Sequence, residues 1–179
     1  LAVVVGLARG PSLEPGPAPP ASKPPTGVPM HRLASAAPLR AALLSSVLLF
    51  AAGGLIGVFI AGSNVRIPAH YHGCIVGVTL ALMGLVFHLL PQLGYGAPQG
   101  RLATLQPWLY GAGQLMHIVG LVWSGGYGVQ RKVAGAEQVL RSPGEIFGMG
   151  LMGLGGLIAI IGGLTFVLVA WRALREGRA

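Results

Sequence analysis

The sequence contains little charge and very few acids. Only 9% of its 179 residues are charged, its acids are four glutamates, and 53% of its residues are hydrophobic. This composition excludes a water-soluble globular domain and indicates a protein with several membrane-spanning segments. The formal net charge is +8, but the basic residues lie between apolar runs, which is typical of membrane topology. We therefore expect a lipid bilayer, and no nucleic acid, as a partner.

Cysteine and buried acids are also scarce. The single cysteine, Cys74, excludes a disulfide within the chain, and a thiol in an apolar run is most often a small buried hydrophobe. Of the glutamates, only Glu145 stands at the expected start of a helix. No buried carboxylate relay for protons is therefore expected.

Apolar runs and a proline-rich segment divide the chain. Residues 1–10, LAVVVGLARG, resemble the end of an upstream helix, so we interpret the chain as a fragment, and residues 11–38 as a proline-rich connector. Each later apolar run can cross ~30 Å of hydrocarbon at ~1.5 Å per residue. The predicted fold is an all-α membrane protein with four transmembrane helices, followed by an inner basic tail at residues 172–179. The four helices are expected at residues 39–61, 68–90, 107–128 and 144–171.

Prolines and glycines support these boundaries. Pro68 and Pro107 stand where a helix is expected to begin, and a proline in a first turn loses no hydrogen bond. The last run is dense in glycine, which we interpret as a surface for close helix packing in lipid.

The distribution of basic residues predicts that both termini lie inside, most simply in a bacterial inner (cytoplasmic) membrane. The inner segments then hold Arg9, Lys23, Arg32, Arg40, Arg101, Arg172, Arg175 and Arg178. The outer segments hold Arg66, Arg131, Lys132 and Arg141. The bases that follow the third helix oppose this bias, so we expect them to have an anionic partner.

Two histidines open the second helix, in the stretch IPAHYHG. His70 and His72 are two residues apart, which places them about 200° apart around a helix. A single metal ion cannot easily take both, so as ligands they would serve two separate centres on either side of the helix. Two hemes fit that arrangement, since each heme iron needs an axial imidazole.

The other histidines give weaker signals. His88 is expected at the opposite membrane face from His70, in an interfacial role, and His31 is expected at the surface. His117 is expected to form a hydrogen bond to a neighbouring helix. Counted from the helix ends, His117 lies ~16 Å deep and His70 ~3 Å deep. This difference argues against His117 sharing an iron with either member of the pair.

The run GGLIGVFIAGSNVRIPAHYHGCIVGVTLALMGLVFHLLPQLGYG resembles helices nine and ten of the heme-copper oxidase catalytic subunit, subunit I of cytochrome c oxidase. Gly53, Gly54 and Gly57 match the family's G-G-x-x-G helix, and residues 69–72 match its A-H-[FY]-H motif. The resemblance implies that His70 binds the iron of a high-spin heme and His72 the iron of a low-spin heme. It also implies that the chain is the last third of a twelve-helix bundle.

The resemblance continues after the third expected helix. Gly128-Val129-Gln130-Arg131-Lys132 resembles the family's glycine and basic pair, which binds heme propionates. Arg131 and Lys132 are therefore the implied propionate ligands, although the family has arginine at both positions and a lysine offers only a point charge. The family's aspartate and histidine before A-H-x-H have no counterpart here, where the segment is short and carries Arg66.

The implied function is that of a terminal respiratory oxidase with two hemes and a copper whose ligands lie outside this chain. The implied partners are upstream helices of the same subunit, other oxidase subunits, oxygen, and cytochrome c or a quinol as electron donor. The fragment alone is predicted to be inactive. Three alternatives stay open: a nitric oxide reductase-like subunit of the same superfamily, a non-catalytic membrane b-type cytochrome, and a structural or assembly subunit without a cofactor.

Overall fold

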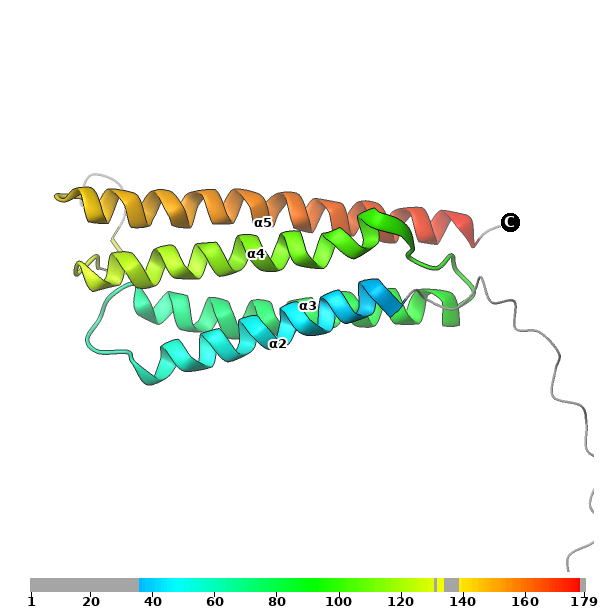
Figure 1. Cartoon of the computed structure of the whole chain (residues 1–179), viewed down its shortest axis with the longest axis horizontal. Coiled ribbons are helices and arrows are strands. Elements are labelled where there is room, and N and C mark those ends of the chain that lie inside the picture. The colour runs from blue at the N-terminus through cyan, green and yellow to red at the C-terminus, as the bar shows by residue number, and fades with distance from the viewer. Residues whose placement is uncertain (1–35, 131, 134–138, 178–179) are drawn as a thin grey trace, which may run out of the picture.

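In the part of the chain that the computed structural model describes, four helices lie side by side (Figure 1). The structure describes residues 36–130, 132–133 and 139–177. Its helices are α2 (Ala36–Val58), α3 (Arg66–Gln92), α4 (Gly100–Gly126) and α5 (Pro143–Glu176). The expected upstream helix end, nearly all of the proline-rich connector, His31 and Arg131 lie outside the described residues. Within the described part, the all-helical prediction is confirmed.

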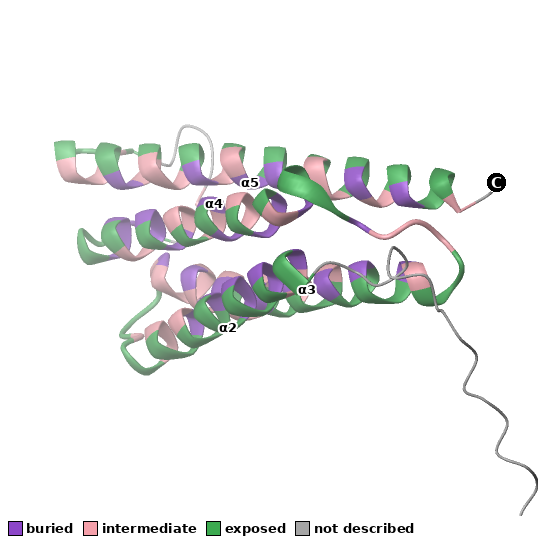
Figure 2. Cartoon of the chain, turned by 45° about the vertical axis from the view of Figure 1, so that its right-hand side comes forward, coloured by how far each residue is buried: buried purple, intermediate pink, exposed green. Residues whose placement is uncertain are grey.

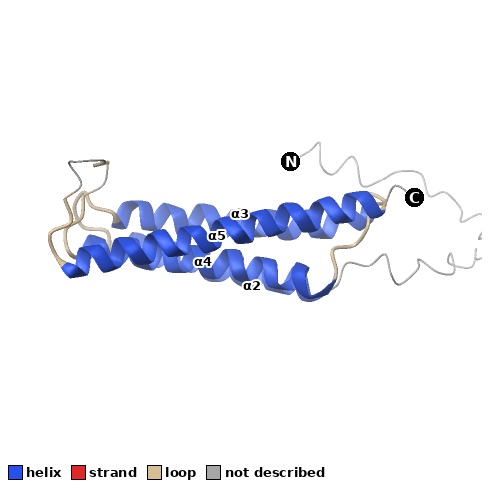
Figure 3. Cartoon of the chain, turned by 90° about the horizontal axis from the view of Figure 1, so that it is seen from above, coloured by secondary structure: helices blue, strands red, loops and turns tan. Residues whose placement is uncertain are grey.

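In Figure 1, α5 and α4 lie above α2 and α3, which overlap in this view. The most extensive packing joins α4 to α5 and α2 to α3, and α4 also packs against both α2 and α3 to a similar extent. The connecting loops gather at the two ends (Figure 3). We call the end with the loop 59–65 and residues 127–130 the histidine end, because His70 and His72 lie near it.

Three of the four helices are long and apolar enough to cross a membrane: α2, α3 and α5. The helix α4 has 27 residues, as many as α3. It is less apolar because it carries polar side chains such as Gln106, Gln114 and His117. The structure therefore supports three of the four expected spans by length and composition, and it supports α4 as a long helix.

The start of α4 differs from the expectation. The helix begins at Gly100, so Pro107 lies inside it and not in its first turn. A proline there removes one hydrogen bond within the helix. Pro107 is buried, and packing against neighbouring helices lets such a position stay helical in a membrane protein. Pro68, in contrast, lies in the first turn of α3, as expected.

Glycines bring the helices into close contact. A Cβ atom on Gly53 of α2 would lie 2.5 Å from the backbone nitrogen of Cys74 on α3, and one on Gly73 would lie 2.6 Å from Cα of Gly53. Between α4 and α5, Gly155 lies against the backbone of His117 in the same way. The interpretation of the glycine-dense last run as a packing surface is confirmed.

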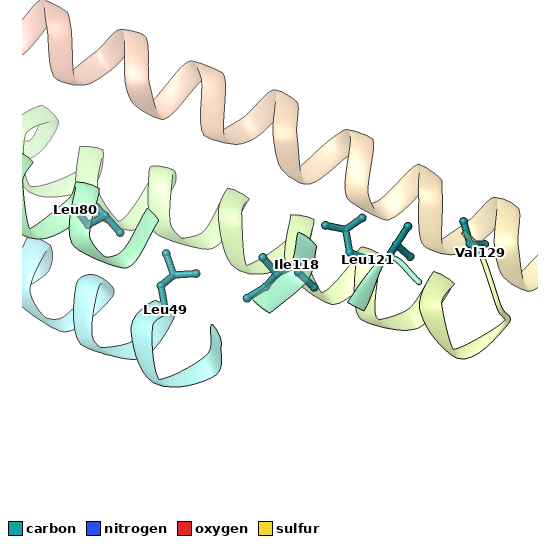
Figure 4. Packing of buried hydrophobic residues seen from close by; sticks show 7 residues of the cluster. Leu49, Leu80, Ile118, Leu121 and Val129 are labelled. Atoms are coloured by element: carbon teal, nitrogen blue, oxygen red, sulfur yellow. The ribbon is translucent and has the colours of Figure 1, made fainter. Parts of the chain in front are cut away.

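The largest cluster of buried side chains joins α2, α3 and α4 near the histidine end. It includes Leu49, Leu80, Ile118, Leu121 and Val129 (Figure 4). Large apolar side chains such as those of Leu43 and Leu164 are exposed on the outer faces of the bundle, where Figure 2 shows many exposed residues. Such a surface suits a hydrocarbon environment.

A backbone contact ties the start of α3 to the end of α4. The amide of Val65 donates to the carbonyl of Val129 at 3.1 Å, and Asn64 pairs with Gln130 as an isolated bridge. This contact holds the start of α3 beside the end of α4, close to the level at which their histidines meet.

Candidate functional site

His70 lies against α2. Its Nδ1 is 2.7 Å from the carbonyl oxygen of Gly53, so the ring donates a hydrogen bond to the backbone of the neighbouring helix. The ring fits there because Gly57 has no side chain, as a Cβ atom at that position would lie 2.6 Å from Nδ1. Two glycines of the G-G-x-x-G motif therefore position this imidazole. Gly53 accepts its hydrogen bond, and Gly57 leaves space for the ring.

Cys74 lies one turn further along α3, on the same side. Its Sγ is 3.9 Å from Nδ1 of His70, a long and weak contact for a thiol. Because the same nitrogen already donates to Gly53 at a much shorter distance, the thiol contributes packing more than hydrogen bonding.

His72 faces α4. Its ring lies parallel to that of His117, with centroids 5.1 Å apart and an angle of 8° between the ring planes. The neighbouring Tyr71 packs against it at 5.0 Å, tilted by 56°. The two histidines of the motif thus contact different helices, in agreement with their spacing on α3.

His117 is itself anchored to α5. Its Nδ1 is 3.0 Å from the carbonyl oxygen of Met152, so the expected hydrogen bond to a neighbouring helix is confirmed. Because this nitrogen carries the proton in the neutral ring, its other nitrogen keeps a lone pair. A chain of contacts therefore runs from α3 through the two stacked rings to α5.

The depth estimate for His117 was wrong with respect to His72. Ring contact places the two side chains at the same level, whereas counting from the expected helix ends separated His117 from the pair. The estimate erred because α3 begins at Arg66, before Pro68, and α4 ends at Gly126. Both changes bring the histidines closer along the bundle axis.

The basic pair falls at the edge of the described structure. Arg131 lies outside the described residues, and Lys132 is exposed, with a backbone φ of 61°. Gly128, which precedes the pair, has a φ of 84° and turns the chain after α4. Lys132 therefore follows a tight turn at the histidine end, the same end of the bundle as His70 and His72.

His88 lies at the other end of α3. Its Nε2 is 2.8 Å from Nε2 of Gln92 one turn later, in an exposed position. Among the described residues, no group of three or more histidine, cysteine or acidic side chains could hold a metal ion.

Sequence reasoning missed the contact between His72 and His117. The two residues lie on different helices, and no spacing within one helix predicts their pairing. A register between α3 and α4 was needed, and the Val65 to Val129 hydrogen bond supplies it.

Comparisons with known proteins find three partial similarities and establish no activity. The chain is 40% identical over 147 residues to an uncharacterized protein of Rickettsia prowazekii, covering 76% of this chain and 28% of that protein. It is 37% identical over 68 residues to an uncharacterized protein of Aquifex aeolicus, covering 38% of this chain and 18% of that one.

A more distant similarity links the chain to an oxidase. It is 29% identical over 126 residues to cytochrome c oxidase subunit 1 of Thermus thermophilus, covering 65% of this chain and 22% of that protein. The chain thus spans between 18% and 28% of the length of these three relatives. No family model matches it, and no solved structure does.

Proposed function

We propose that the chain is the C-terminal part of the catalytic subunit of a terminal respiratory oxidase of the cytochrome c oxidase type. The observation that carries this proposal is the placement of His70 and His72 against different neighbouring helices. The distant similarity to cytochrome c oxidase subunit 1 supports it.

The hydrogen bonding of His70 fits a role as an iron ligand. Its Nδ1–H donates to Gly53 at 2.7 Å, which fixes the tautomer and leaves the lone pair of Nε2 for a metal. Histidine ligands in proteins commonly have this kind of backbone support on the second nitrogen. In the proposal, His70 binds the iron of the high-spin heme.

The environment of His72 fits a ligand whose ring plane is set by packing. His117 covers one face of the ring, and Tyr71 packs against it at a tilt. In the proposal, His72 binds the iron of the low-spin heme. One axial imidazole per heme from this chain is sufficient, so the proposal does not require a cluster of three ligands.

The remaining parts of each cofactor site belong to the rest of the protein. The cavities described for this chain are lined by neither His70 nor His72, so other segments would enclose the macrocycles. Bound hemes would supply electron transfer and, with copper held by residues outside this chain, oxygen reduction. Arg131 and Lys132 would pair with heme propionates.

In this proposal α4 crosses the membrane together with α2, α3 and α5, because it lies beside them along the bundle (Figure 1). Both chain ends then lie on the inner side of a bacterial inner membrane. The partners are the upstream helices, other oxidase subunits, and cytochrome c or a quinol.

The test is the cofactor content and turnover of the purified full-length protein. We expect two hemes and copper per subunit, with consumption of oxygen. The 179-residue chain expressed alone should insert in the membrane with both ends inside and should not reduce oxygen. Iron in place of copper, with turnover of nitric oxide, would favour a nitric oxide reductase-like subunit.

A second candidate is a non-catalytic b-type cytochrome in which His72 and His117 are both ligands. Their rings lie side by side at one level, but because the nitrogen lone pairs lie in the ring planes, the stacked rings would have to separate to hold one iron between them. In that case His117→Ala would abolish the low-spin heme signal. In an oxidase, where His117 is not a ligand, the same variant would keep it. Low-spin absorbance of the His117→Ala protein therefore separates the two candidates.

A further inference from the structure

Arg66 is held in an unusual position at the histidine end. It is the first residue of α3, and its side chain lies across the last turn of α4. A Cβ atom on Gly125 would lie 2.7 Å from its Cγ, and one on Gly126 would lie 3.4 Å from its Nη2. Because these two residues of α4 have no side chains, the Arg66 side chain can lie directly against the helix backbone.

The Nε atom of the Arg66 guanidinium is buried and makes no hydrogen bond within the described residues. Of the two described carboxylates, Glu145 accepts from the amide of Arg141 and from Ser142 at the start of α5, and Glu176 lies at the opposite end of the bundle. Leaving a buried donor unpaired is costly, and more so for a charged group.

An apolar pocket adjoins this guanidinium. It has a volume of about 310 Å³ and is lined by Leu55, Ile56, Phe59 and Val122 together with Arg66. Leu55 and Phe59 are 62% and 66% exposed, so the pocket opens onto the outer surface of the bundle between α2 and α4. A cation at one edge of an apolar, outward-facing pocket is complementary to an anion that carries an apolar chain.

We propose that this pocket binds an anionic phospholipid, with its phosphate at the Arg66 guanidinium and part of an acyl chain against the apolar side chains. Arginine pairs with phosphate through parallel hydrogen bonds. A turn of the guanidinium toward the pocket would bring its buried Nε into reach of the phosphate as well. The end of a bundle of membrane-length helices is also where lipid headgroups lie. This inference depends on the membrane setting, and it is independent of the proposed heme ligands.

Native mass spectrometry of the full-length protein tests the proposal. Delipidated protein is titrated with phosphatidylglycerol, and in parallel with phosphatidylcholine and a free fatty acid. We expect one phosphatidylglycerol site that Arg66→Gln weakens by about tenfold or more, as for loss of a charge-assisted hydrogen bond. Arg66→Lys should keep part of the affinity.

Two further variants make the result specific. Arg40→Gln removes an exposed arginine near the start of α2, at the other end of that helix, and should leave the site unchanged. Leu55→Trp places a larger side chain at the mouth of the pocket and should weaken binding without removing a charge. Thermal unfolding of each variant shows whether it is folded.

Several outcomes would overturn the proposal. Equal losses from Arg66→Gln and Arg40→Gln would show only general attraction to anionic lipid. Equal binding of fatty acid with no preference for phosphatidylglycerol would exclude a phosphate site. Unchanged lipid binding with a shifted heme reduction potential in Arg66→Gln would mean that the arginine pairs with a cofactor carboxylate.

Discussion

The two sides of α3 hold an imidazole in different ways. On the side of α2, a backbone hydrogen bond of 2.7 Å fixes His70, and glycines on both helices bring the backbones together. On the side of α4, a parallel ring holds His72, and that ring is anchored to α5. The two residues share a helix and a motif but depend on different neighbours.

This difference has a chemical consequence. A hydrogen bond to a carbonyl fixes both the orientation and the tautomer of a histidine, whereas stacking restricts the plane of the ring and leaves its tautomer open. We therefore expect His70 to be sensitive to changes in α2, and His72 to changes in α4 and α5.

The largest expected effect separates the two histidines directly. In the full-length protein, His72→Ala should remove the low-spin heme signal. His70→Ala should keep that signal and abolish carbon monoxide binding at the high-spin heme, because each residue serves one iron. Reduced-minus-oxidised spectra of membranes, with and without carbon monoxide, measure both. Identical spectra from the two variants, or unaltered heme bands in both, would contradict the assignment.

The sequence was sufficient for the features that a single helix encodes. The apolar runs predicted the helices, the spacing of His70 and His72 predicted that they contact different neighbours, and the glycines of the last run predicted close packing. Each of these depends only on helical periodicity and on residue size.

Features that depend on the relative position of two helices were less predictable. The partner of His72 became clear only once the loop contact between Val65 and Val129 set the height of α4. The early start of α4 was missed because tertiary packing kept Pro107 inside a helix. That the Nε of Arg66 is buried without a hydrogen bond among the described residues was likewise visible only in the folded structure.

The side of α3 that faces α2 should be the more sensitive to added volume. Gly53→Ala would place a Cβ atom 2.5 Å from the backbone of Cys74, so the helices must separate and the Gly53 carbonyl must move from His70. We expect a loss of about 1–3 kcal/mol of stability, seen as earlier thermal unfolding in detergent.

Gly54 provides the matched control for this variant. It is the next residue of α2, and a Cβ atom there would have no neighbour within 4 Å. Gly54→Ala should therefore be neutral or slightly stabilising, since alanine favours a helix over glycine. Equal unfolding temperatures for the two variants would show that α2 and α3 do not pack as closely as described.

The side that faces α4 should show a smaller effect, which depends on ring shape. His117→Leu removes the flat ring face beside His72 and should let the His72 ring move more freely. The expected loss of stability is ~0.5–1.5 kcal/mol, as for an aromatic pair. His117→Phe keeps the face and loses the hydrogen bond to Met152. The measurement is electron paramagnetic resonance of the low-spin heme, whose anisotropy depends on the planes of its axial ligands.

A comparison of the low-spin heme spectra of His117→Leu and His117→Phe shows which contact of His117 positions His72. Broader or shifted low-spin resonances in His117→Leu, with a nearly normal spectrum in His117→Phe, would identify the stacked face as the positioning element. Equal disturbance in both would assign that role to the hydrogen bond with Met152. Unchanged spectra in both would show that His72 is held without His117.

The smallest expected effect concerns the basic pair that follows α4, which the proposed function places beside cofactor carboxylates. Arg131→Ala should leave both axial ligands in place and lower the heme reduction potentials, because a nearby cation favours the state that has gained an electron. Lys132→Arg keeps the charge and should leave the potentials almost unchanged, which makes it the charge-matched control. Redox titration of the full-length variants measures the shift. If Arg131→Ala leaves the potentials of both hemes unaltered, the pair serves only to close the loop between α4 and α5. The helix contacts of His70 and His72 would then be this chain's remaining influence on the two reduction potentials.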